Sequence, residues 1–209
     1  MLIKKFDSHK WIYPFIMRGP DVMKKNLPLI VQLHGAGERG DGDKELLLVE
    51  AHGFSHILDE NIECDCLLVQ PQCKKDSFWV ADIQSIISFI NQIADEFEVD
   101  RSRIYLTGIS MGGFGTWYTA MACPDMFAAI APCCGGGMPW NAHVLTMPVW
   151  AFHGDADNVV SPHYSIEMIE ELKKNNSEAR LTIYKGVGHN SWEQAYSKEL
   201  LEWLLSKRK

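Results

Sequence analysis

Gly108-Ile109-Ser110-Met111-Gly112 is the stretch that decides the fold of this chain. The apolar residues 103–107 come directly before it and predict a buried strand, and residues 113–122 come directly after it and predict a helix. A turn that joins a strand to a helix in so few residues leaves little room for side chains at its flanks, and glycine stands on both sides of the serine. The pattern therefore predicts that Ser110 projects from the edge of a sheet with its hydroxyl accessible.

Two interpretations of this turn compete. Gly-x-Ser-x-Gly between a strand and a helix is typical of a nucleophile elbow, in which the serine hydroxyl attacks a carbonyl carbon and the amides that begin the helix face the developing oxyanion. The same five letters also occur by chance in glycine-rich turns, where the serine only forms hydrogen bonds. The remainder of the chain has to decide between the two.

Composition limits the class of protein. The 209 residues are 46% apolar and 22% charged, which is ordinary for a globular protein, and this length predicts one domain over residues 1–209. The net charge of -7 argues against nucleic acid and anionic membrane as partners, since both need a basic patch. The first ten residues lack the apolar core of a secretory signal, and no apolar run reaches membrane-spanning length. We therefore expect a cytoplasmic protein.

Strands and helices alternate along most of the chain. This order predicts an α/β fold in which helices cover both faces of a mainly parallel sheet, without a large cap domain. Pro14 favours an edge position for the first strand, and Gly53 a break in the first helix. The expected strands are residues 11–18, 27–33, 66–70, 103–107, 126–132, 148–152 and 179–184, and the expected helices are residues 44–61, 82–97, 113–122, 162–175 and 192–207.

Candidate catalytic residues stand where the expected strands end. A serine needs a base to become a nucleophile at neutral pH, and the base needs an orienting carboxylate. His189 lies in a glycine-rich loop between the last strand and the last helix, where it can overhang the sheet edge. Asp155 and Asp157 both precede it, in the required order of serine, acid and histidine, and spacing alone does not choose between them. His153 is expected to brace their loop.

The oxyanion needs two backbone amides. One is expected from Met111, the residue after the serine, and the other from the glycine-rich loop that follows the strand at residues 27–33. Ala36 is the first candidate in that loop and Gly37 the second. Glu38 and Arg39 could contact substrate, but the expected role is pairing that holds the loop.

Residues 33–40, 108–115, 153–160 and 188–189 together resemble the α/β-hydrolase superfamily of serine esterases. Most similar are small lidless carboxylesterases with a dienelactone-hydrolase or prolyl-oligopeptidase-like catalytic domain. The resemblance extends from about residue 27 to the end of the chain and implies an α/β-hydrolase fold with no cofactor. It also implies that Asp157, the second aspartate of its motif, is the acid. Ser110, Asp157 and His189 would then hydrolyse short-chain or aryl carboxylic esters through an acyl-enzyme.

Other functions stay open beside this one. The same residues would serve a serine peptidase of the prolyl-oligopeptidase type that acts on small peptides, or a feruloyl or acetyl esterase that acts on oligosaccharide esters. Acyl transfer to an alcohol and a binding protein that has lost catalysis are further alternatives. The expected partner is in each hydrolytic case a small molecule, and the sequence does not indicate the oligomeric state.

Three tryptophans in expected loops, Trp79, Trp140 and Trp192, predict an aromatic rim around an open site, although loop tryptophans also pack against helix ends. We expect no metal site. His52 and His56 have helical spacing but lack the accompanying Glu-x-x-His pattern. The six cysteines, at positions such as Cys64 and Cys66, do not show the usual zinc spacings and are expected to be reduced and mostly buried.

Overall fold

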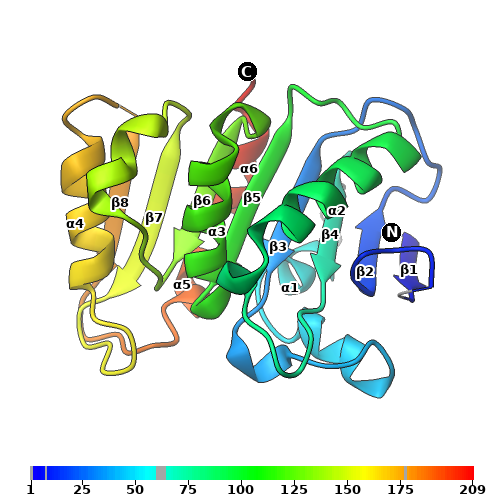
Figure 1. Ribbon diagram of the computed structural model, residues 1–209, viewed down its shortest axis with the longest axis horizontal. Helices are drawn as coiled ribbons and strands as arrows, with labels where there is room; N and C mark the ends of the chain where they lie inside the picture. Colours follow the sequence, from blue (N-terminus) through cyan, green and yellow to red (C-terminus); the bar gives the residue numbers. More distant parts are fainter. Residues whose placement is uncertain (1, 8, 60–64, 177) are drawn as a thin grey trace.

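The computed structural model describes residues 2–7, 9–59, 65–176 and 178–209. Eight strands form one sheet in the order β1-β2-β4-β3-β5-β6-β7-β8 (Figure 1). β1 and β2 are antiparallel to their neighbours, and every pairing from β4 to β8 is parallel. The strands are β1 Leu2–Phe6, β2 Phe15–Gly19, β3 Leu29–Leu33, β4 Leu67–Pro71, β5 Ile104–Ile109, β6 Ala129–Cys133, β7 Val149–Gly154 and β8 Ala179–Tyr184.

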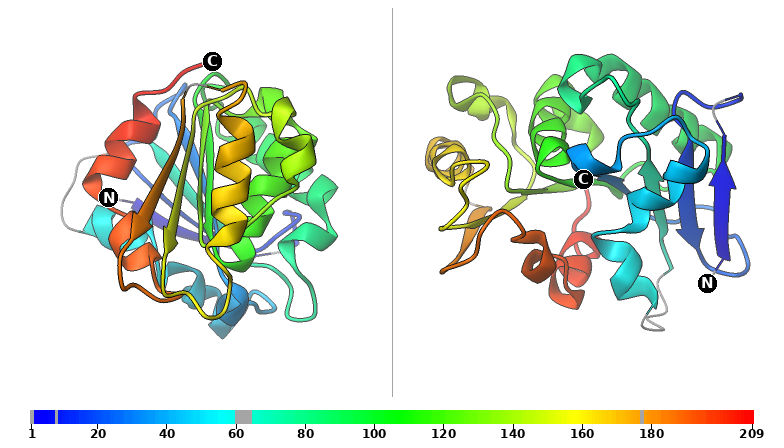
Figure 2. Two further views of the ribbon diagram at one scale, coloured as in Figure 1. Left: turned by 90° about the vertical axis from the view of Figure 1, so that its left-hand side faces the viewer. Right: turned by 90° about the horizontal axis from the view of Figure 1, so that it is seen from below.

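Helices cover both faces of the sheet, as the alternating pattern predicts. In Figure 1, α2, α3 and α4 lie in front of the sheet and α1, α5 and α6 lie behind it, and the side view in Figure 2 separates the same two layers. Each layer packs onto its own apolar cluster, so β3 to β6 are buried along their whole length. The α-helices are α1 Phe54–Asp59, α2 Ile83–Glu96, α3 Met111–Ala122, α4 His163–Leu172, α5 Trp192–Ala195 and α6 Lys198–Leu205. No cap domain interrupts this order within the described ranges.

The first strand differs from its prediction. β2 begins at Phe15, directly after Pro14, and it is fully buried between two partners instead of lying at an edge. The edge belongs to β1, which the sequence analysis did not identify. The sequence analysis missed β1 because its three middle residues, Ile3, Lys4 and Lys5, are exposed, so the strand has no continuous apolar run.

Two expected helices are shorter and interrupted. A 3-10 helix, Lys44–Glu50, precedes α1, and Gly53 separates the two with a φ of 91° that favours glycine. Asn61, the expected end of this helix, lies outside the described residues. The closing helix is split into α5 and α6 because the Ser197 hydroxyl accepts a hydrogen bond from the Leu200 amide at 3.3 Å and caps a new helix.

The expectation of reduced cysteines is wrong at Cys66, whose sulfur takes part in a disulfide. Cys73, Cys123, Cys133 and Cys134 are free, and Cys64 lies outside the described residues. Within the described residues, no helix has both the length and the apolar character needed to cross a bilayer.

Strand register brings the loops of interest to one edge of the sheet. Leu33 pairs with Gly108 at the ends of β3 and β5, and Cys133 pairs with Phe152 near the ends of β6 and β7. Gly154 pairs with Tyr184 at the ends of β7 and β8. Because these strands are parallel and end together, the loops that follow them converge at their carboxyl ends.

Candidate active site

Ser110 occupies a strained turn between β5 and α3. Its φ of 52° and ψ of -115° are costly for a residue with a side chain. The neighbours impose this conformation, because the Ser110 amide donates to the Cys133 carbonyl oxygen at 3.0 Å. A Cβ at Gly112 would overlap with the Leu33 carbonyl oxygen, so only glycine allows the end of β3 to pack this closely. The turn therefore holds the half-exposed Ser110 at the carboxyl edge of the sheet.

An unbroken chain of hydrogen bonds connects Ser110, His189 and Asp157. His189 Nδ1 lies 2.7 Å from Asp157 Oδ2, and His189 Nε2 lies 2.9 Å from Ser110 Oγ. An ionised carboxylate can only accept hydrogen bonds, so Nδ1 is protonated and donates a hydrogen bond to Asp157. Nε2 is then left with a lone pair that accepts from the serine hydroxyl. The structure thus brings together the three residues that the sequence proposed as nucleophile, base and acid.

The two candidate acids have separate places. Asp157 is buried, its Oδ2 faces His189, and its Oδ1 accepts from the backbone amides of Val159 and Val160 at 2.9 Å each. Asp155 is exposed, and its Oδ1 accepts from the Gly186 amide at 2.6 Å. Asp155 therefore holds the beginning of the loop that carries the histidine, while Asp157 contacts the histidine itself.

The surroundings of Asp157 keep its carboxylate ionised. Burial would raise the pKa of the Asp157 carboxyl, but the hydrogen bonds from His189 and from the amides of Val160 and Val159 together lower it below its ordinary value. A negative charge is thus available next to His189 Nδ1 throughout the neutral range. This is the arrangement that stabilises an imidazolium when Nε2 takes a proton.

His34 fixes the loop that follows β3. Its Nδ1 donates to the Gly35 carbonyl oxygen at 2.6 Å, its Nε2 accepts from the Cys73 amide at 2.9 Å, and its own carbonyl oxygen accepts from Trp79 Nε1 at 2.9 Å. Burial lowers the pKa of His34 to about 4, so the ring is neutral at neutral pH. A neutral ring is what this pattern of one donor and one acceptor requires.

Ala36 and Gly37 lie in a short 3-10 helix, Ala36–Glu38, directly after this anchored segment. Both are exposed, and Met111 begins α3 on the other side of the close contact between Leu33 and Gly112. The loop and the start of α3 are therefore neighbours at the sheet edge. The roles of the Met111 and Ala36 amides as oxyanion donors stay predictions.

The three candidate rim tryptophans have different environments. Trp79 is only 1% exposed, and the prediction that it forms part of a rim is wrong, because its indole is used to hold the His34 carbonyl. Trp140 is 78% exposed. Trp192 is half-buried, with its ring centroid 5.3 Å from that of His189 and also 5.3 Å from that of His52. Trp192 is thus the candidate that contacts the proposed base.

Glu38 does not pair with Arg39, contrary to expectation. The Arg39 guanidinium donates to the carbonyl oxygens of Ala36 and Ser77, at 2.9 and 3.3 Å. Glu38 Oε2 is buried and has no hydrogen-bond partner among the described residues, and the nearest histidine nitrogen, Nδ1 of His34, is 3.8 Å away. Arg39 therefore holds the loop through backbone oxygens instead of through its neighbour.

Cys134 is a residue beside the site that the sequence analysis missed. Its sulfur and one ligand atom each from Asp157 and His189 lie within 4.8 Å of one another. Such a trio resembles a set of metal ligands, but Asp157 and His189 already bond to each other, and we assign no metal to it. Burial raises the pKa of the Cys134 thiol far above its ordinary value, so it is an uncharged neighbour. Its place directly after β6, at the shared strand ends, is the signal that could have identified it.

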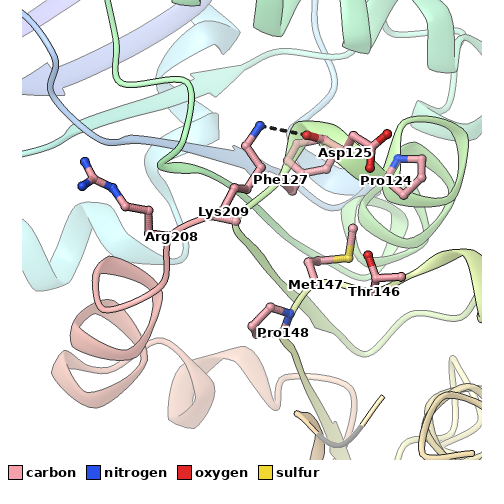
Figure 3. Close-up of a pocket in the computed structure, with 9 residues that line it drawn as sticks. Pro124, Asp125, Phe127, Thr146, Met147, Pro148, Arg208 and Lys209 are labelled. Carbon is pink, nitrogen blue, oxygen red and sulfur yellow. Dashed lines mark hydrogen bonds between the residues drawn. The ribbon is translucent and has the colours of Figure 1, made fainter. Parts of the chain in front are cut away.

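A separate cavity of about 420 Å³ lies at the amino ends of β6 and β7, whereas the catalytic candidates lie at the carboxyl ends of the strands (Figure 3). Lys209 Nζ donates to the Asp125 carbonyl oxygen at its border, at 2.8 Å. None of its lining residues belongs to the catalytic candidates. They are Pro124, Asp125, Phe127, Ala128, Thr146, Met147, Pro148, Arg208 and Lys209.

Known proteins resemble this chain in sequence and in fold. A bifunctional acetylxylan esterase/xylanase of Neocallimastix patriciarum is 28% identical over 162 residues, which cover 75% of this chain and 22% of that protein. Poly(3-hydroxyalkanoate) depolymerase C of Paucimonas lemoignei is 32% identical over 130 residues, which cover 56% of this chain and 30% of that protein. The crystal structure of a thermostable esterase superposes with a TM-score of 0.83 at 31% identity and covers 100% of this chain, which spans 63% of that one.

The chain thus spans less than a third of the length of the two curated relatives. Residues 71–199 match the dienelactone hydrolase family, and this segment is more than half of the chain and includes all three candidate catalytic residues. The chain belongs to the dienelactone hydrolase family.

Proposed function

We propose that this protein is a serine carboxylesterase. The observation that carries the proposal is the hydrogen-bond chain from Ser110 Oγ through His189 to Asp157, with steps of 2.9 and 2.7 Å, at a strained strand-to-helix turn. The esterase names of the relatives support the same reaction class. The strained backbone at Ser110 is typical of functional sites.

The geometry suggests the order of proton movements. Ser110 Oγ attacks the ester carbonyl carbon while its proton moves to His189 Nε2, and the Asp157 carboxylate stabilises the resulting imidazolium. The carbonyl oxygen takes the negative charge and faces the proposed amides of Met111 and Ala36. When the tetrahedral intermediate collapses, the alcohol leaves with the proton from Nε2. Water then repeats the sequence on the acyl-serine and releases the acid.

Short-chain or aryl esters are the proposed substrates. Trp192 offers an aromatic face next to the base, and no inserted domain covers the site within the described part of the chain. Acetyl esters of sugars are a second candidate, because one relative bears the name acetylxylan esterase/xylanase. A disulfide at Cys66 is unusual in a cytoplasmic protein, so the cytoplasmic location expected from the sequence stays a prediction.

A panel of p-nitrophenyl esters and sugar acetates tests the reaction class. Ser110→Ala should abolish turnover, and a fluorophosphonate probe should label the wild type but not this variant. Asp157→Asn should lower kcat by roughly a thousandfold or more, as loss of the orienting carboxylate does in other triads. Asp155→Asn is the matched control, because it changes the same loop without touching His189, and it should retain most of the activity. Unchanged turnover by Ser110→Ala would refute the proposed function.

A further inference from the structure

The proposed acid is shared by two imidazoles. The imidazole ring of His153 lies beside Asp157. Its Nε2 is 3.3 Å from Asp157 Oδ2, the same oxygen that accepts a hydrogen bond from His189. His153 is fully buried near the end of β7, and its Nε2 also lies 2.9 Å from the Val160 carbonyl oxygen. On the other side of the ring, Nδ1 lies 2.7 Å from Ser165 Oγ. Two acceptors therefore face Nε2, and one hydroxyl faces Nδ1.

The two oxygen acceptors near Nε2 determine which nitrogen of His153 is protonated. If Nδ1 alone carried the proton, the lone pair of Nε2 would face two oxygen acceptors, those of Asp157 and Val160, inside the protein. If Nε2 carries it, its N–H donates to the Val160 carbonyl oxygen and faces the Asp157 carboxylate, and the Ser165 hydroxyl can donate to Nδ1. The Nε2–H form is therefore the favoured neutral tautomer.

The Ser165 hydroxyl also allows a charged His153. Its oxygen lies 3.0 Å from the Gly135 carbonyl oxygen, to which it can donate when Nδ1–H donates to Ser165. Burial lowers the pKa of His153 and opposes that charge, while Val160 and Asp157 favour it. In both protonation states, Nε2–H faces the Val160 carbonyl oxygen and the Asp157 carboxylate beside it.

We propose that His153 is a positioning residue for the acid: its Nε2–H donates to Val160 and to Asp157 Oδ2, holds the carboxylate, and takes part of the interaction that Asp157 would otherwise give to His189. This inference rests on the proposed function, since it assigns a partner to the same acid. The distances that support it are those from the ring nitrogens of His153, which is not one of the three catalytic candidates.

Sharing of the carboxylate has a consequence for pH dependence. The titratable groups that face His189 are Asp157, the uncharged Cys134 and, across Asp157, His153. Without the donor at His153, Asp157 Oδ2 would interact with His189 alone and would favour its protonated form more strongly. Less free base would remain at a given acid pH, and activity would be lost at a higher pH than in the wild type.

The test compares His153→Phe, which removes both ring nitrogens, with His153→Gln, whose side-chain amide can place a donor close to the position of Nε2. His153→Phe should move the acid limb of kcat/KM upward by about half a unit to one pH unit, a threefold to tenfold loss below the limb, and should lower the plateau. His153→Gln should restore both toward the wild type. Identical acid limbs in wild type, His153→Phe and His153→Gln would overturn the proposal.

A measurement on the unaltered protein covers the case in which His153→Phe fails to fold. Nitrogen-15 NMR of histidine-labelled wild type reads the tautomer of His153, with the resonance assigned by its loss in His153→Gln. A proton on Nε2 is expected, and an Nδ1–H tautomer with a bare Nε2 would overturn the proposal. Ser110→Ala keeps the two questions apart, because its activity tests the esterase assignment while the tautomer of His153 does not depend on turnover.

Discussion

Acidification should destabilise this protein through His34, the neutral histidine that anchors the loop after β3. Burial lowers the pKa of His34 to about 4, against about 6.5 for a histidine in an unfolded chain. The unfolded state therefore binds more protons between these two values, and the free energy of unfolding falls as the pH falls through this range. The contribution is fully present above pH 6.5.

The size of the effect follows from the difference between the two pKa values. A gap of about 2.5 units corresponds to roughly 3 kcal/mol, and about 2–3 kcal/mol of it should be lost between pH 7.5 and pH 4.5. Other groups titrate in the same interval, so the wild type has to be compared with a variant that lacks the titrating ring. His34→Gln is suitable, since its amide oxygen can accept from the Cys73 amide in place of Nε2.

Urea unfolding at the two pH values, followed by circular dichroism, gives four free energies. The wild type should lose about 2–3 kcal/mol more than His34→Gln between pH 7.5 and pH 4.5. The comparison removes any constant cost of the substitution, because only the change with pH is used. Equal losses in the two proteins would refute the reasoning, since they would mean that His34 protonates as readily in the folded protein as in the unfolded chain.

Two further substitutions test the packing of the site. Gly112→Ala places a methyl group where the Leu33 carbonyl oxygen lies, so the turn must shift, and kcat/KM should fall by roughly a hundredfold in an ester assay. A variant with wild-type activity would show that the close approach is dispensable. Trp192→Ala should lower kcat/KM for aryl esters by about threefold to tenfold through loss of the ring contact with His189, and by more than Trp140→Ala does; the opposite ranking would exclude Trp192 as the residue that matters.

Apolar runs and motif order were sufficient to predict much of the fold. Fully buried strands such as β3 and β5 have largely apolar sequences because helices cover both of their faces, and this signal is local. The order of Ser110, Asp157 and His189 at successive strand ends predicted residues that the structure places in one hydrogen-bond chain. Parallel strands that end together make such convergence a matter of topology.

Other features depend on contacts between distant segments. The loop position of Trp79 suggested exposure. Its indole N–H instead donates to the carbonyl oxygen of His34, 45 residues away in sequence, and the ring is buried. Spacing did not separate Asp155 from Asp157, because the choice depends on which of them turns inward beneath His189. β1 has exposed residues at its centre and no apolar run, so its pairing with β2 is what defines it as a strand.

The position of β8 as the last strand of the sheet affects how activity is lost on mild denaturation. The loop that carries His189 follows β8, which among the described strands pairs with β7 alone, whereas Ser110 follows β5 in the middle of the sheet. A partial opening of that outer strand would separate the base from an otherwise intact nucleophile elbow. Ester hydrolysis would then depend on whether β8 stays paired, and it would be lost before the central strands unfold.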